Sequence, residues 1–168
     1  MNITVQVEPA DIAPPAVRYR WDTDTAILTA SLFDAAPAGQ GLSGSVELAG
    51  DDGSWVILDV KAGRINGVEV AVWPDVRKMT VLDPPVHTPA VRLVVASRRP
   101  ESGVAVLQMD TALIAESDQT ERTIHFRLGS CRAARTLRIA RDVLVDVDER
   151  QSIKGIWLLN VPPFPSDA

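Results

Sequence analysis

The residue types that could do chemistry are few in this sequence. Its two histidines are His87 and His125, and its one cysteine is Cys131. A zinc site draws histidine and cysteine ligands from short, regular spacings, and these three residues have none of them. We interpret the histidines as surface residues and Cys131 as an ordinary small thiol. The sequence therefore predicts no metal ion and no cofactor.

The motifs of common enzyme classes are also missing. A serine nucleophile is typically held in a Gly-x-Ser-x-Gly turn, and the nearest approach, at residues 41–44, is one residue short. No glycine-rich phosphate loop occurs, and the acidic turn at Asp146, Asp148 and Glu149 lacks the ligand pattern of a calcium loop. We assign no catalytic residue, and the sequence leans away from an enzyme.

Tryptophan gives a more specific signal. Trp21, Trp55 and Trp73 all lie in the first half of the chain, at the ends of expected strands. Indole rings in such places belong either to the rim of the core or to an aromatic platform that binds a planar small molecule or a sugar. We retain these three tryptophans as candidate ligand-binding residues.

Four arginines form the candidate partner-binding set. Arg132, Arg135, Arg138 and Arg141 recur every third residue in a slightly basic second half, whereas the first half is acidic. The basic excess is too small for a phosphate footprint, which argues against a nucleic acid partner. The opposite polarity of the halves leaves two interpretations, a solvated basic face or association of the chain with itself or with a protein partner.

The segment that carries these arginines, residues 131–142, has two interpretations. On a helix of 3.6 residues per turn, the arginine stripe would drift by about 60° per step and leave a single face. As a strand, it points Leu137 and Ile139 to one side and Arg138 to the other. We prefer the strand.

Composition sets the class of protein. The chain has 168 residues and a net charge of −5, which suits one domain or two very small ones. No run approaches the roughly 18 apolar residues of a membrane span, and residues 1–15 lack the features of a secretory signal. The expectation is a cytoplasmic protein with no membrane partner.

Turn signals predict an all-β chain. Clusters of Gly, Pro and Asp recur every roughly 8 to 12 residues between short apolar runs. We expect two repeated antiparallel meanders that form a sandwich or an open barrel, with little helix. The expected divisions are an N-terminal strand and Pro-rich lead at 1–16, a first repeat at 17–74, a Pro-rich connector at 75–89 and a second repeat at 90–168.

Two similar hairpins suggest the repeat. An apolar run that ends in Asp-Val, a polar turn and then Ile-x-Gly occur at residues 56–67 and again at 143–155. Further alignment places residues 17–19 against 91–93. We interpret Asp59 and Asp146 as caps of the turn amides, and Gly67 and Gly155 as places of a bulge or a close backbone approach.

The same residues resemble a known family. Tyr19, Asp24 and Leu28 precede a Val-Glu-Leu strand and the first Asp-Val hairpin, a pattern similar to the small bacterial domain-of-unknown-function family numbered 2283. The likeness covers residues 17–73 and, as a second diverged copy, 135–160, where Trp157 replaces the usual acidic residue. The resemblance implies a bacterial chain and a fold unit, and it implies no functional residues because the family carries no established chemistry.

These observations favour a non-enzymatic β-domain that binds a protein partner or associates with itself as a homo-oligomer, such as a homodimer. The exposed edges expected of its sheets support this class. The alternative is a small-molecule or carbohydrate-binding module that uses the Trp-rich first repeat. An enzyme of unrecognised type is the least favoured class.

Overall fold

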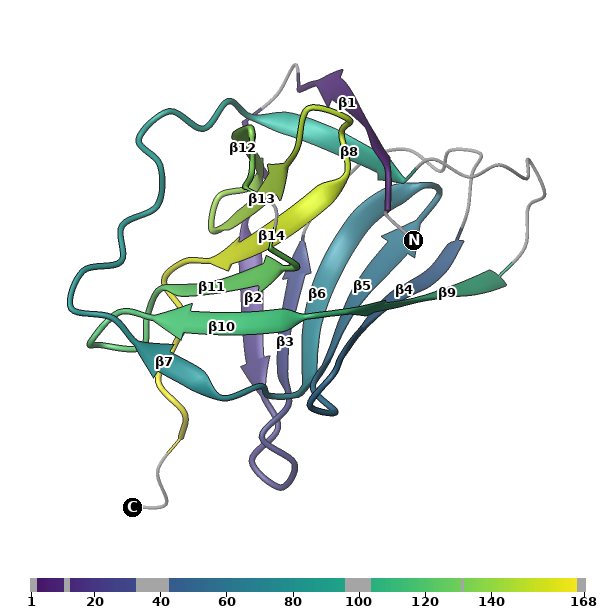
Figure 1. Cartoon of the computed structure of the whole chain (residues 1–168). Helices are drawn as coiled ribbons and strands as arrows, with labels where there is room; N and C mark the ends of the chain where they lie inside the picture. Colours follow the sequence, from purple (N-terminus) through teal and green to yellow (C-terminus); the bar gives the residue numbers. More distant parts are fainter. Residues whose placement is uncertain (1–2, 11–12, 33–42, 96–103, 131, 166–168) are drawn as a thin grey trace.

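Strands form wherever β-branched and apolar residues alternate with polar ones, and they end at Gly, Pro and Asp turns. A computed structural model describes residues 3–10, 13–32, 43–95, 104–130 and 132–165 (Figure 1). The first strands are β1 (Val5–Pro9), β2 (Val17–Trp21), β3 (Leu28–Leu32), β4 (Ser43–Gly50), β5 (Trp55–Lys61), β6 (Arg64–Val72) and β7 (Val76–Lys78). The others are β8 (Val91–Val95), β9 (Val104–Thr111), β10 (Leu113–Ser117), β11 (Ile124–Leu128), β12 (Arg135–Ala140), β13 (Val143–Val147) and β14 (Ile153–Leu158). These described residues contain no helix, and so none that could cross a membrane.

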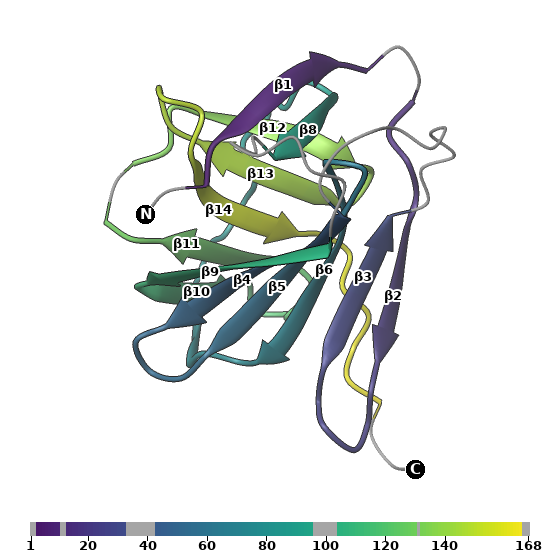
Figure 2. The ribbon, with the colours of Figure 1, turned by 90° about the vertical axis from the view of Figure 1, so that its right-hand side faces the viewer.

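The strands build two mixed sheets. The first has the order β1-β8-β6-β5-β4-β9, with β3 also paired to β6 and β2 paired to β3; the second has the order β12-β13-β14-β11-β10-β7. Two pairs, β4–β9 and β7–β10, are parallel. The run from β9 into β10 leaves the first sheet and enters the second, so the sheets curl around a shared core (Figures 1 and 2). This architecture confirms the predicted all-β sandwich or open barrel.

The same strand order occurs in both sheets. Each sheet contains a five-stranded unit, with the spatial order β2-β3-β6-β5-β4 in the first and β10-β11-β14-β13-β12 in the second. In chain order, the first two strands of a unit form a hairpin and the last three form a meander. The second strand of the hairpin pairs with the final strand of the meander. By this order β10, which begins at Leu113, is the counterpart of β2. The expected division of the chain at residue 90 stays a prediction. Strand β8 pairs with β1 and β6 in the first sheet. A tandem duplication of one ancestral unit stays a prediction.

Single elements follow the expected pattern with small shifts. Residues 135–140 form β12, so the strand interpretation of this segment is confirmed. The Pro-rich connector expected at 75–89 contains one short strand, β7, and residues 104–117 are divided between β9 and β10. The N-terminal strand expected within residues 1–16 is β1, which begins at Val5 and includes Pro9.

The core lies between the facing sides of the two sheets. Both sheets supply its largest side chains, among them Leu28, Leu48 and Leu58 from the first and Phe126 and Leu137 from the second. Leu144 and Trp157 are also buried, yet they do not belong to this cluster. Because side chains alternate along a strand, and Val143 and Val145 face the core, Leu144 lies on the outward side of the second sheet.

Candidate functional site

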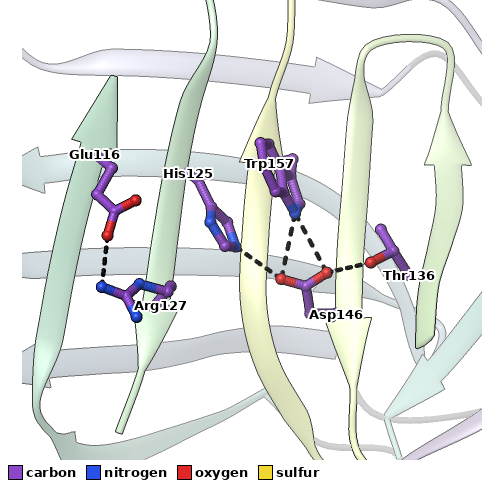
Figure 3. A network of polar contacts seen from close by, with 6 residues as sticks. All are labelled: Glu116, His125, Arg127, Thr136, Asp146 and Trp157. Carbon is purple, nitrogen blue, oxygen red and sulfur yellow. Dashed lines mark hydrogen bonds and ion pairs between the residues drawn. The ribbon is translucent and has the colours of Figure 1, made fainter. Parts of the chain in front are cut away.

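A buried polar cluster occupies that outward side of the second sheet (Figure 3). It comprises His125 of β11, Thr136 of β12, Asp146 of β13 and Trp157 of β14. The strand register brings the four together, because His125 lies opposite Trp157, and Asp146 lies opposite Thr136 in the neighbouring pair. Each side chain comes from a different strand, so the cluster exists only in the assembled sheet.

The carboxylate of Asp146 is the centre of the cluster. Its Oδ2 lies 2.7 Å from Nε2 of His125, and its Oδ1 accepts a hydrogen bond of 2.5 Å from Oγ1 of Thr136. Nε1 of Trp157 lies 3.2 Å from both carboxylate oxygens. The His125 ring stacks on the Trp157 indole, with centroids 3.8 Å apart. A buried carboxylate requires such donors, and here three side chains supply them.

Gly155 leaves the room for this contact. A Cβ atom at Gly155 would lie 2.4 Å from Oδ2 of Asp146 and 3.0 Å from both Nε2 of His125 and the carbonyl oxygen of Phe126. The expected close approach at Gly155 therefore involves two side chains as well as the neighbouring backbone. The glycine and the His125–Asp146 pair are parts of one arrangement.

Two of the sequence interpretations were wrong here. His125 is buried and paired, although His87 is exposed as expected. Asp59 and Asp146 do not cap turn amides, since Asp146 binds side chains and Asp59 accepts a hydrogen bond from Nδ2 of Asn66. The roles of His125 and of the two aspartates could not be predicted from their polar positions on the strands. Which side chains they contact depends on the order of the strands in the sheet. Cys131 lies outside the described residues.

The turn after β13 uses a different aspartate. Oδ1 of Asp148 accepts hydrogen bonds of 2.9 Å from the backbone N–H groups of Arg150 and Ser152. These bonds, that from Ser152 first, lower the pKa of Asp148 below its ordinary value. Capping is therefore done by the residue within the turn.

The polar cluster has the features of a structural network. His125 has Nε2 engaged with Asp146 and one ring face covered by Trp157. A second pair continues the outward side, with Nη2 of Arg127 at 2.5 Å from Oε1 of Glu116. Ser117 follows Glu116 directly and so points to the opposite side of β10, away from His125. Within the described ranges, no group of three or more His, Cys, Asp or Glu side chains is placed to hold a metal ion.

The candidate tryptophans divide into two places. Trp21 and Trp73 stack with centroids 5.6 Å apart and pack against the core cluster. Their indole N–H groups donate within the chain, Trp21 to the carbonyl of Pro162 at 2.9 Å and Trp73 to that of Ala26 at 2.8 Å. Trp55 is more exposed, on the outward side of β5 opposite Val72. Trp21 and Trp73 therefore lie at the rim of the core, and their polar groups are already bonded.

The candidate arginines lie on and around β12. Arg132, Arg135 and Arg141 are exposed, whereas Arg138 is half-buried. The N–H of Arg138 donates to the carbonyl of Pro89 at 2.9 Å, and its Nε lies 3.3 Å from Oγ1 of Thr88. Its Nη1 also donates to the Arg141 carbonyl. Arg138 thus anchors the end of the Pro-rich connector beside β12.

Most sheet edges are short, charged or covered. At β1, the backbone N–H of Val5 donates to the carbonyl of Gln151, and the strand ends in a proline. Strand β7 has three residues and exposes Arg77 and Lys78. The outer strand β2 contacts the C-terminal segment, where Oη of Tyr19 donates to the carbonyl of Leu159 at 2.7 Å; burial is the main reason that the pKa of this tyrosine is raised.

Strand β9 is the exception. It has eight residues, and among the described strands it pairs only with β4. Asp110 is its single charged residue, at one end, and Val106 near the other end is 60% exposed. A long, nearly uncharged edge of this kind is a template for another strand.

No family model matches the chain, and no curated protein matches it either. The resemblance to the family numbered 2283 accordingly stays a prediction. The function has to be argued from the polar cluster, the aromatic residues and the edge of β9.

Sequence reasoning missed both the cluster and the edge. A signal for the edge was present, because residues 104–109 form an uncharged, strand-like run of six residues. Nothing in the sequence could show that this run lies at the margin of a sheet. The cluster gave no comparable signal, since its four residues are scattered over four strands.

Proposed function

We propose that this chain is a non-enzymatic interaction module that binds a protein strand along the open edge of β9. The observation that carries the proposal is an eight-residue strand with one paired side in the described part of the chain. Strand addition supplies a ladder of backbone hydrogen bonds, and alternate side chains of the added strand give specificity.

The contrast among the edges supports this proposal. Proteins commonly protect edge strands with charge, proline, short length or a covering segment. The edges at β1, β2 and β7 show these devices, through Pro9, the C-terminal segment, and Arg77 with Lys78. Within the part of the chain that the structure describes, strand β9 shows none of them over residues 104–109, and its outward Val106 is exposed.

The aromatic residues give less support to a small-molecule or sugar site. A sugar platform uses exposed rings and their polar tips. The N–H groups of Trp21 and Trp73 donate to backbone carbonyls, and Phe164 packs edge-on against Trp21 with centroids 5.2 Å apart. Trp55 alone stays exposed, which is too little for a platform.

A labelled peptide tests strand addition directly. The probe is a fluorescent peptide with the sequence of residues 104–111, flanked by lysines for solubility, titrated with the protein while anisotropy is recorded. We expect binding that weakens about tenfold or more in a Val106→Lys, Gln108→Lys variant, because lysine protects edges. The matched control, Val81→Lys with Val86→Lys, adds the same charge at exposed valines of the connector and should bind normally.

Either of two results contradicts the proposal. One is the absence of any anisotropy change with the wild-type chain at about 1 mM protein, which would place the affinity below that of a weak specific contact. The other is equal binding by the edge variant and by the connector control. A scrambled peptide of the same composition excludes binding by hydrophobicity alone.

A further inference from the structure

We infer that the strand received by β9 belongs to a second copy of this chain, in an antiparallel β9–β9 pair about a two-fold axis. The inference rests on the proposed strand addition and names its partner. Such a pair would join the first sheets of the two copies into one continuous sheet.

Closure at two copies follows from the number of open edges. An interface between different patches builds rings or filaments, whereas an interface of one patch with itself closes as a dimer. In the described ranges, β9 is the one long edge that is nearly uncharged and uncovered, since β1 ends in a proline, β7 is short and β12 carries arginines. It therefore has no second open edge of the same chain to join. Self-pairing is the arrangement that uses up this edge completely.

The position of the charge selects the antiparallel direction. Asp110 lies near the C-terminal end of β9, and the residues before it are uncharged. In a parallel pair, the two Asp110 carboxylates would lie side by side, and like charges directly opposite each other destabilise a sheet. In an antiparallel pair they lie at opposite ends of the contact. The antiparallel pair is also the one that a two-fold axis perpendicular to the sheet produces.

The alternation of side chains restricts the register. Val106, Gln108 and Asp110 are exposed on the outward side, whereas Met109 is buried on the core side. Residues directly opposite each other in an antiparallel pair share a side of the sheet. The two-fold axis must therefore pass where one residue lies opposite the same residue of the second copy, and not between two neighbouring residues. A contact of about seven residue pairs then places the axis at Leu107 or Gln108.

Sedimentation velocity over a concentration series tests the inference. We expect a reversible monomer–dimer equilibrium for the wild type, with a dissociation constant raised about tenfold or more by Val106→Lys with Gln108→Lys. The connector control, Val81→Lys with Val86→Lys, should dimerise like the wild type. Raising the salt should not weaken the dimer, because its contacts are backbone hydrogen bonds and, apart from Asp110, uncharged side chains. A dimer built on the β12 arginines would weaken.

Disulfide trapping tests the axis. In a Cys131→Ser background, a cysteine at position 107 or 108 should crosslink two chains under mild oxidation. Opposite residues in an antiparallel pair have Cα atoms about 4.5–5.5 Å apart, within the range of a disulfide. Cysteine at position 81 should stay monomeric in the same gel. Crosslinking at position 81 with none at positions 107 and 108 would overturn the axis.

The outcomes separate the two proposals. A monomeric wild type that still binds the labelled peptide overturns the second copy as partner and leaves strand addition standing. Open-ended oligomers overturn the two-fold arrangement. A dimer that the edge variant leaves intact, together with no peptide binding, overturns both.

Discussion

Two hairpins of this molecule have the same backbone design and opposite surroundings. In β5–β6, Asp59 lies opposite Gly67, and in β13–β14, Asp146 lies opposite Gly155. The register of each hairpin shifts directly after its aspartate. Asp59 is nevertheless exposed and Asp146 is buried. The backbone of the hairpin therefore determines the position of the aspartate, and does not determine whether its carboxylate is buried.

The neighbouring strands make the difference. Beside Gly155, β11 and β14 place His125 opposite Trp157. At the corresponding place in the first sheet, β3 and β6 place Thr29 opposite Glu69. An aromatic pair excludes water and supplies N–H donors, whereas a threonine and a glutamate leave the surface polar. The comparison teaches that two residues on adjacent strands decide whether the central carboxylate is buried.

The largest expected effect is at the glycine. Gly155→Ala should lower the free energy of unfolding by about 3 kcal/mol, because its Cβ would collide with the Asp146 carboxylate and the Phe126 carbonyl. At Gly67 the nearest atom to a Cβ is the Ala30 carbonyl oxygen at 3.1 Å, so Gly67→Ala should cost clearly less. Urea unfolding of both variants measures the difference, and equal losses would contradict it.

The aspartates should differ next. Asp146→Ala leaves the donors of His125, Thr136 and Trp157 without their shared acceptor, and we expect a loss of about 2 kcal/mol. Asp59→Ala removes one exposed contact to Asn66 and should change stability by less than about 0.5 kcal/mol. Chemical denaturation checks both values; a loss at Asp59 as large as that at Asp146 would remove the distinction between the hairpins.

A smaller effect is expected at the indole. Trp157→Phe keeps an aromatic ring beside His125 and removes the N–H that lies 3.2 Å from both oxygens of Asp146. The loss should be about 1 kcal/mol, the typical net value of one hydrogen bond. Glu69→Gln at the corresponding place serves as the control and should be nearly neutral. If thermal unfolding shows no loss for Trp157→Phe, the indole is not a partner of Asp146.

The smallest effect concerns acid stability of the turns. Hydrogen bonds from the Ser152 and Arg150 N–H groups depress the pKa of Asp148 in the folded chain. A depressed pKa stabilises the fold above the unfolded pKa of about 3.9, and this contribution is lost as the pH falls through the lower native pKa. Asp148→Asn should therefore make the fall in urea midpoint between about pH 5 and 2 less steep.

In this variant the urea midpoint should still fall at acid pH, but less steeply than in the wild type. The pKa of Asp52 and that of Asp118 are also lowered in the folded chain. The turn of the first hairpin, at Ala62 and Gly63, contains no carboxylate. If the urea midpoint of Asp148→Asn falls with pH as steeply as that of the wild type, the hydrogen bonds to Asp148 do not contribute to acid stability.

The fold class could be predicted from the sequence because its signals are local. Alternation and turn residues follow one another along the chain, so the two similar hairpins at 56–67 and 143–155 could be located. Strand order is a long-range property, and it moved β8 and β9 into the first sheet. The same limit applies to the sites, because His125 looks like a surface residue until Asp146 and Trp157 are known to flank it.

The most direct measurement of the central claim is the mass of the protein in solution. One chain has a mass of 18.2 kDa, so sedimentation equilibrium should give about twice that mass at high concentration, as expected for a closed two-fold dimer. The Val106→Lys, Gln108→Lys variant should give a clearly lower mass than the wild type at the same concentration, because its dissociation constant is raised about tenfold or more. A wild type that stays monomeric, or a variant that dimerises equally well, would contradict pairing of two chains through β9.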